Sequence, residues 1–152
     1  MPERGRIQEL LLAYRSNITL LKKWEKDKTL REWRTDYDAR RRTGGLLGQN
    51  PADPTRSKKD GLSIQEKLLL EQQNVLEKVE RIRTDVELTR LLLFQLNDFD
   101  HRLMNLRYEE GKDVRDICAI LFISKSSFYR RLNAIVQEMS KAYDRFYQDV
   151  NA

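Results

Sequence analysis

The chain has few of the residues from which catalytic and metal sites are built. It contains one cysteine, Cys118, and one histidine, His101, among 152 residues. A lone cysteine excludes an internal disulfide, and no Cys/His cluster has the spacing of a zinc site. Adjacent carboxylates such as Glu109 and Glu110 form no convergent acid–base pair. We therefore expect no enzyme, no metal and no cofactor, with Cys118 in the core and His101 as a surface or half-buried helix residue.

Long hydrophobic runs are also missing. The first 17 residues contain no apolar run longer than a few residues, so nothing resembles a signal peptide, and no segment is long enough to span a bilayer. The mean hydropathy is −0.73 and 35% of the residues are charged, which favours solvated helices over a large compact core. We expect a cytoplasmic protein with no membrane partner.

Acidic residues are fewer than basic ones. The chain has 29 Lys and Arg against 24 Asp and Glu, with an isoelectric point near 9.4, which favours a polyanionic partner. The surplus lies in the first 60 residues, which carry 15 basic and 9 acidic side chains. The front half is therefore a second candidate for nucleic-acid contact, beside the C-terminal segment described below.

Glycine and proline are scarce outside one segment. Four of the six glycines fall in residues 43–61, TGGLLGQNPADPTRSKKDG, together with Asn-Pro and Asp-Pro dipeptides, which predicts a flexible loop. No Gly-Lys-Ser/Thr follows these glycines, so the segment does not match a phosphate-binding loop. On either side, apolar residues recur at helical spacing. We predict a long basic amphipathic helix over 1–42 and a long heptad-patterned helix over 62–96.

The heptad pattern of residues 62–96 predicts a helix–helix seam. Ser63 and Glu66 are spaced as a capping box at its start. One heptad position holds Leu68, Val75, Ile82, Thr89 and Leu96, and the other holds Val79, Val86 and Leu93. The partner of this seam is open between two hypotheses, which are compatible: a hairpin with residues 6–42 of the same chain, or a homodimer through residues 62–96.

Residues 113–136, DVRDICAILFISKSSFYRRLNAIV, predict a helix-turn-helix. Apolar residues recur at three- and four-residue spacing on both sides of a tight break: Val114, Ile117, Cys118 and Leu121, then Phe128, Leu132, Ile135 and Val136. Ser124 is placed to cap the second helix by accepting hydrogen bonds from amides of its first turn. No acidic residue lies between Asp116 and Glu138, so the outward face of the second helix suits a DNA major groove.

The segment from about Asp98 onward resembles region 4 of bacterial sigma factors. LMNLRYEEG at 103–111 is similar to the first helix and glycine stop of that region, and ISKSSF at 123–128 to its turn and recognition-helix entry. Such a domain at the end of a small basic protein with a long helical front half also resembles the ArpU/RinA-type late transcription regulators of bacteriophages. The DPT at 53–55 suits that family as well.

The resemblance implies an all-α fold. A long N-terminal helical hairpin or coiled coil would be followed by a helix-turn-helix DNA-binding domain at 97–152. One position departs from the pattern, because Phe122 stands where a glycine usually occupies the turn. A bulky residue at positive φ is strained, so we expect a distorted or slightly rerouted turn.

The function implied is a sequence-specific DNA-binding regulator, acting at a promoter as a phage activator of late genes. Its place would be the host cytoplasm and nucleoid, with double-stranded DNA and host RNA polymerase as partners. Ser124 would cap the recognition helix, and Arg130 is the best candidate for base reading because arginine makes two parallel hydrogen bonds to guanine. The other residues expected to face base edges or groove walls are Lys125, Ser126, Tyr129 and Asn133. The residues expected to hold phosphates are Arg115, Ser127 and Arg131.

Two other functions remain open. The first is a DNA-packaging protein similar to the phage small terminase subunit, which also couples a helix-turn-helix with oligomerising helices. The second is a helical protein-interaction module or anti-activator, in which the motif binds only protein. Subunit number would discriminate the first from a promoter-binding regulator, and salt-dependent DNA binding would dismiss the second.

Overall fold

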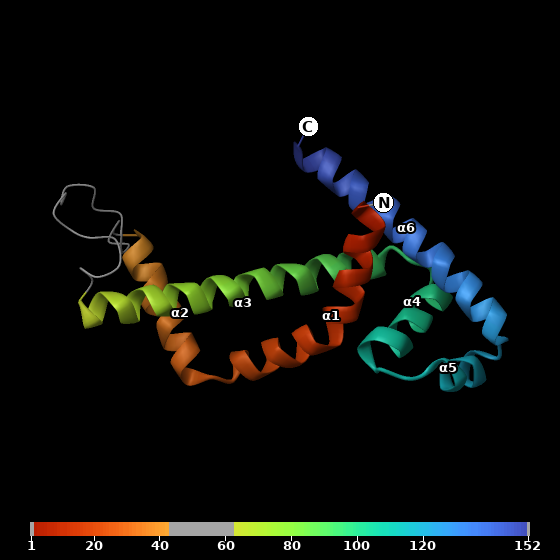
Figure 1. The fold of residues 1–152 in the computed structure, drawn as a ribbon, viewed down its shortest axis with the longest axis horizontal. Coiled ribbons are helices and arrows are strands. Elements are labelled where there is room, and N and C mark those ends of the chain that lie inside the picture. The colour runs from red at the N-terminus through yellow and green to blue at the C-terminus, as the bar shows by residue number, and fades with distance from the viewer. Residues whose placement is uncertain (1, 43–62, 152) are drawn as a thin grey trace. The chain divides into compact units, whose positions relative to one another are not determined.

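The computed structural model describes residues 2–42 and 63–151, and every regular element within these ranges is a helix. The all-α expectation is confirmed. In chain order (Figure 1), the elements are α1 (Pro2–Glu25), α2 (Lys28–Arg42), α3 (Ile64–Phe94), α4 (Asp98–Met104), the π-helical turn η1 (Asn105–Glu109), α5 (Val114–Leu121) and α6 (Lys125–Asn151). The loop predicted at 43–61 lies outside the described residues.

The helix predicted over 1–42 is divided in two. The chain turns after Glu25, where the amide of Asp27 donates to the carbonyl of Trp24 at 3.0 Å. The carboxylate of Asp27 then accepts a hydrogen bond from the amide of Leu30 at 3.2 Å, which caps the start of α2. Neither proline nor glycine marks this break, so the capping aspartate was the signal that the sequence prediction missed.

The described residues form two compact units. One contains the residues up to Thr19 and those from Arg83 onward, and the other spans Leu20–Ile82. The first unit groups the end of α3 and the start of α1 with the C-terminal helices, and the domain division predicted at residue 97 stays a prediction. This unit is assembled from segments that are distant in sequence.

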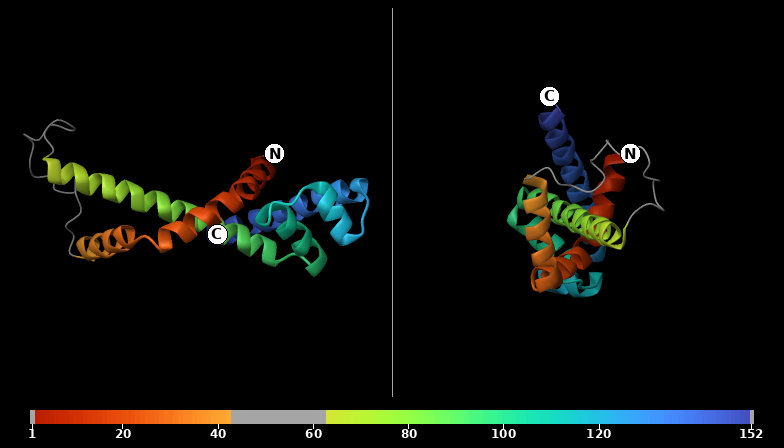
Figure 2. Two further views of the ribbon diagram at one scale, coloured as in Figure 1. Left: turned by 90° about the horizontal axis from the view of Figure 1, so that it is seen from below. Right: turned by 90° about the vertical axis from the view of Figure 1, so that its left-hand side faces the viewer.

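Within the first unit, the start of α1 crosses the end of α3 (Figures 1 and 2). Arg6 forms an ion pair with Asp85 at 2.9 Å. Tyr14, which is 3% exposed, makes a hydrogen bond with Arg90, and burial raises the pKa of the Tyr14 hydroxyl. Ile7 is fully buried. The apolar stripe of α1 therefore has a partner inside the unit that carries the helix-turn-helix.

The second unit pairs α2 with the beginning of α3. Arg34 forms an ion pair with Glu80, and Nη2 of Arg40 donates to Oε1 of Gln72 at 2.8 Å. From the first of these contacts to the second, the residue number rises along α2 and falls along α3. The two helices therefore run antiparallel. The hairpin predicted between residues 6–42 and 62–96 is not confirmed as a whole by these contacts and stays a prediction, as does the homodimer.

The heptad seam of α3 is buried over part of its length. As predicted, Ser63 caps the helix by accepting from the amide of Glu66 at 3.1 Å. Val79, Val86, Thr89 and Leu93 are at most 6% exposed. Val75 and Ile82 are half-buried, and Leu68 is 60% exposed. The pattern thus identified the buried face correctly in the middle and end of the helix, but not at its start.

Helices α4 and α5 both pack on α6 (Figures 1 and 2). Most of their core is apolar, and its apolar members exposed by 1% or less are Leu103, Met104, Ile117, Phe128, Ile135 and Met139. Asn97 caps α4 and Asp113 caps α5, each through a side-chain oxygen that accepts an amide of the first turn. Gly111 has a φ of +71°, and an added Cβ would lie 1.8 Å from Nη1 of Arg15. The predicted glycine stop therefore has a conformational reason, whereas the flexible end of the exposed Arg15 side chain can move away from an added Cβ.

Candidate nucleic-acid interface

The turn between α5 and α6 consists of Phe122, Ile123 and Ser124. Phe122 adopts φ 57° and ψ 46°, the left-handed conformation, and its amide donates to the carbonyl of Cys118. The amide of Ile123 donates to the same carbonyl at 3.1 Å. Phe122 therefore takes the conformation that a glycine would take at a helix C-terminus, so the expected rerouting is not observed. Its ring is 92% exposed, so packing does not compensate this strain.

The first turn of α6 is capped as predicted. Oγ of Ser124 accepts from the amide of Ser127 at 3.1 Å and donates to Oγ of Ser127 at 2.9 Å. The same Oγ lies 3.3 Å from Oγ of Ser126. The turn contains no acidic residue, so the positive end of the helix dipole is not offset by a side chain of its own.

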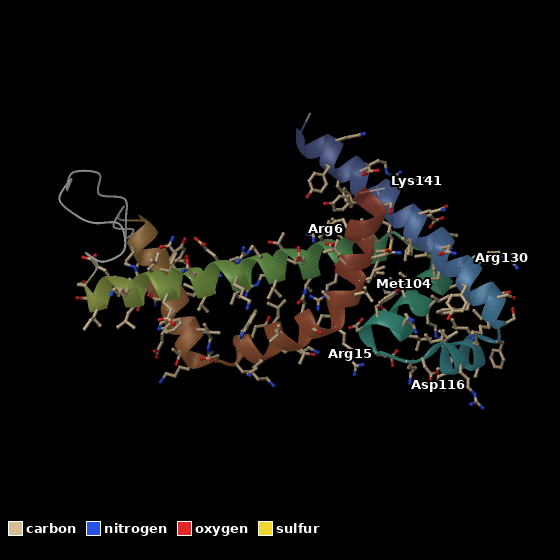
Figure 3. All side chains as sticks on the ribbon, viewed as in Figure 1. Arg6, Arg15, Met104, Asp116, Arg130 and Lys141 are labelled. Carbon is tan, nitrogen blue, oxygen red and sulfur yellow. The ribbon has the colours of Figure 1, made fainter. Side chains whose placement is uncertain are left out.

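The residues predicted to face DNA bases are all exposed on α6: Lys125, Ser126, Tyr129, Arg130 and Asn133. Because successive residues are about 100° apart around a helix, Arg130 lies on the side opposite to the fully buried Phe128. Figure 3 shows the side chain of Arg130 pointing outward from α6. Tyr129 is 44% exposed and rests edge-on against the ring of Phe128. The structure thus brings these five side chains to the accessible surface of one helix.

The three residues predicted to hold phosphates have different surroundings. Arg115 is exposed on α5, and Ser127 is half-buried beside the cap. Arg131 is exposed but has partners within the domain: its Nε donates to Oδ1 of Asp100 at 2.6 Å, and its guanidinium lies 5.4 Å from the centre of the Phe99 ring. Arg131 therefore has a structural partner that the sequence did not reveal.

Sequence reasoning missed Asp100 and Phe99. The side chain of Asp100 is 6% exposed, although it lies in the first turn of a short helix. A signal was present, because Asp100 is followed at positions 103 and 104 by buried Leu and Met, which places the carboxylate on the inward face of α4. No pattern in the sequence, however, connects Asp100 to a residue 31 positions later.

A hollow lies beside α6. Its lining comes from α4, the turn and α6 and consists of Phe99, Ile123, Ser127, Arg130, Arg131 and Ala134. Apolar side chains supply half of this lining, and the two guanidinium groups and one hydroxyl are all hydrogen-bond donors. An anionic ligand fits this donor set better than a cationic one.

Other candidate sites are weak. Cys118 is half-buried rather than in the core, and His101 is half-buried with Nδ1 3.3 Å from Nδ2 of Asn105. Among the residues that the structure describes, no group of three or more His, Cys, Asp or Glu side chains is placed to hold a metal ion. Over the same ranges, no helix combines the length and apolar character needed to cross a bilayer.

Comparison with known proteins adds no relative: no family model matches the chain, and the searches of curated proteins and of solved structures gave no match. The likeness to sigma region 4 and to the phage late regulators therefore stays a prediction.

Proposed function

We propose that this protein is a sequence-specific DNA-binding transcription regulator, a phage activator of late genes of the ArpU/RinA type. One observation carries the proposal: the start of α6 exposes polar and basic side chains from Lys125 to Asn133 with no acidic residue among them, while Phe128 is fully buried behind them. An α-helix with such a face fits the major groove of B-form DNA.

The proposed roles within this face are based on the positions of the side chains. Arg130 points outward and would read a guanine through two parallel hydrogen bonds. Ser126 and Asn133 share its side of the helix, since they are four residues before and three residues after it. Ser127 and Arg131 lie toward α4 and would contact a backbone phosphate, with Arg115 of α5 as a further phosphate contact. The role is binding rather than catalysis.

Two further partners belong to the proposal. Host RNA polymerase would be the second partner of an activator of this type. A homodimer through residues 62–96 is favoured by Ile64 and Leu68, which are 80% and 60% exposed on one side of α3. A second copy would cover these side chains and place two recognition helices on adjacent half-sites.

The function is tested by fluorescence anisotropy with duplex DNA selected from a random library. The affinity should fall steeply as salt rises. Arg130→Ala should relax the preference at one base pair by about 1–3 kcal/mol of discrimination. Lys141→Ala is the matched control, because it removes the same charge from an exposed position farther along α6 and should leave the base preference unchanged.

The outcomes separate the alternatives. A folded protein that binds no duplex at low salt contradicts the proposal and favours the protein-interaction module. A ring of many subunits in light scattering favours the packaging protein instead. Equal, sequence-independent losses from Arg130→Ala and Lys141→Ala would mean that Arg130 contributes charge and reads no base.

A further inference from the structure

Arg131 is held by the domain and still has donors to offer. Its guanidinium carries five N–H groups, and only Nε is used by Asp100. Among the described residues, its two Nη groups have no other polar partner. The side chain is 47% exposed and lines the hollow beside α6. The Nη groups can therefore bind a ligand without breaking the internal ion pair.

The partners of Arg131 fix its direction. Asp100 cannot turn easily, because Oδ2 accepts from Nδ2 of Asn97 at 3.2 Å while Oδ1 accepts from Arg131. The face of the Phe99 ring lies 5.4 Å from the guanidinium carbon and limits rotation of its plane. An arginine ordered in this way before binding loses less conformational entropy when it binds.

The hollow provides a second donor. Oγ of Ser127 accepts a hydrogen bond from Ser124, so its own proton is available to a ligand. Arg130 also lines the hollow, and no acidic residue belongs to the lining. These donors suit a tetrahedral, singly charged group with several acceptor oxygens.

We propose that this hollow seats one backbone phosphodiester of the bound DNA, and that Asp100 and Phe99 are positioning residues that aim Arg131 at it. This inference rests on the proposed DNA-binding function. Because the Asp100–Arg131 pair carries no net charge, its contribution to binding is geometric rather than electrostatic. A geometric and an electrostatic contribution therefore predict opposite changes in DNA affinity when the charge of Asp100 is removed.

The test is Asp100→Asn, measured by duplex affinity in the full-length protein. Removing a negative charge close to DNA raises the affinity if charge alone matters. The proposal expects the opposite, a loss of about 2- to 10-fold, the factor associated with ordering one long side chain on binding. Asp98→Asn is the matched control: it removes the same charge from an exposed position on the same helix and should leave the affinity unchanged or slightly higher.

Folding is checked by circular dichroism. If Asp100→Asn unfolds, Phe99→Leu carries the test, because it removes the stacked ring from a 37% exposed position without changing any charge. The loss should again be about 2- to 10-fold. An affinity equal to or above that of the wild type in the folded variant overturns the inference while the DNA-binding function stands. A wild-type protein that binds no duplex overturns both.

A phosphate scan distinguishes DNA from a free anion. Duplexes are prepared with one neutral methylphosphonate at each position in turn. At one position, the wild type and Asp100→Asn should bind equally, since the contact that separates them is gone. The contrary result is that the affinities of the wild type and Asp100→Asn differ at every methylphosphonate position, while inorganic phosphate shifts the Nε–H resonance of Arg131. In that case the hollow binds a free anion and the inference is wrong.

Discussion

Replacing Phe122 with glycine should stabilise the helix-turn-helix. Phe122 is the one described non-glycine residue with positive φ, at 57°, and an L-residue in this left-handed region costs about 1–2 kcal/mol. Glycine adopts the conformation without strain, but its larger freedom in the unfolded chain reduces the resulting gain in stability by about 0.5–1 kcal/mol. The ring is 92% exposed, so its removal loses little burial. The free energy of unfolding should rise by about 0.5–1 kcal/mol.

The assay is urea denaturation followed by circular dichroism at 222 nm. Phe122→Ala is the matched control, because alanine removes the same ring but keeps a Cβ in the left-handed conformation. Its free energy of unfolding should stay close to that of the wild type, and Phe122→Gly should lie above both. If Phe122→Gly is the least stable of the three, or if alanine and glycine have the same effect, backbone strain at this turn is not what the substitution relieves.

Two further predictions concern the packing of α1 and α3. Val86→Asp should lower the free energy of unfolding by at least about 3 kcal/mol in urea denaturation, because Val86 is 1% exposed, whereas Leu91→Asp on the same helix, 48% exposed, should change it little. Comparable losses would mean that α3 buries a different face. Burial raises the pKa of Tyr14 above its ordinary value of about 10, so the neutral hydroxyl stabilises the fold below that pH and this contribution is lost as the pH rises through the folded pKa. Tyr14→Phe should therefore make stability less dependent on pH above about 10 in denaturation measured across alkaline pH, and an unchanged slope would contradict this assignment.

Sequence patterns that extend over only a few neighbouring residues were enough to predict the local structure. Helical periodicity and the scarcity of glycine and proline predicted an all-α chain, because each depends only on the spacing of neighbouring residues. The same holds for the caps at Ser63 and Ser124, which accept amides three residues ahead. The glycine stop at Gly111 was predicted from the resemblance to sigma region 4, and its positive φ agrees. The exposed face of α6 followed from the same reasoning, since it is the complement of its buried stripe.

Tertiary structure decided what these signals could not. Arg131 looks like any exposed basic residue of a recognition helix until α4 brings Asp100 and Phe99 beside it. The grouping of α1 with the C-terminal helices likewise depends on contacts such as Arg6 with Asp85, which are 79 positions apart. Local patterns state which face of a helix is apolar, but not which of several apolar faces it meets. Which faces pack together depends on the shape and charge of all the helices that meet. This packing determines which arginines on α6 are positioned by the fold and which are exposed to a partner.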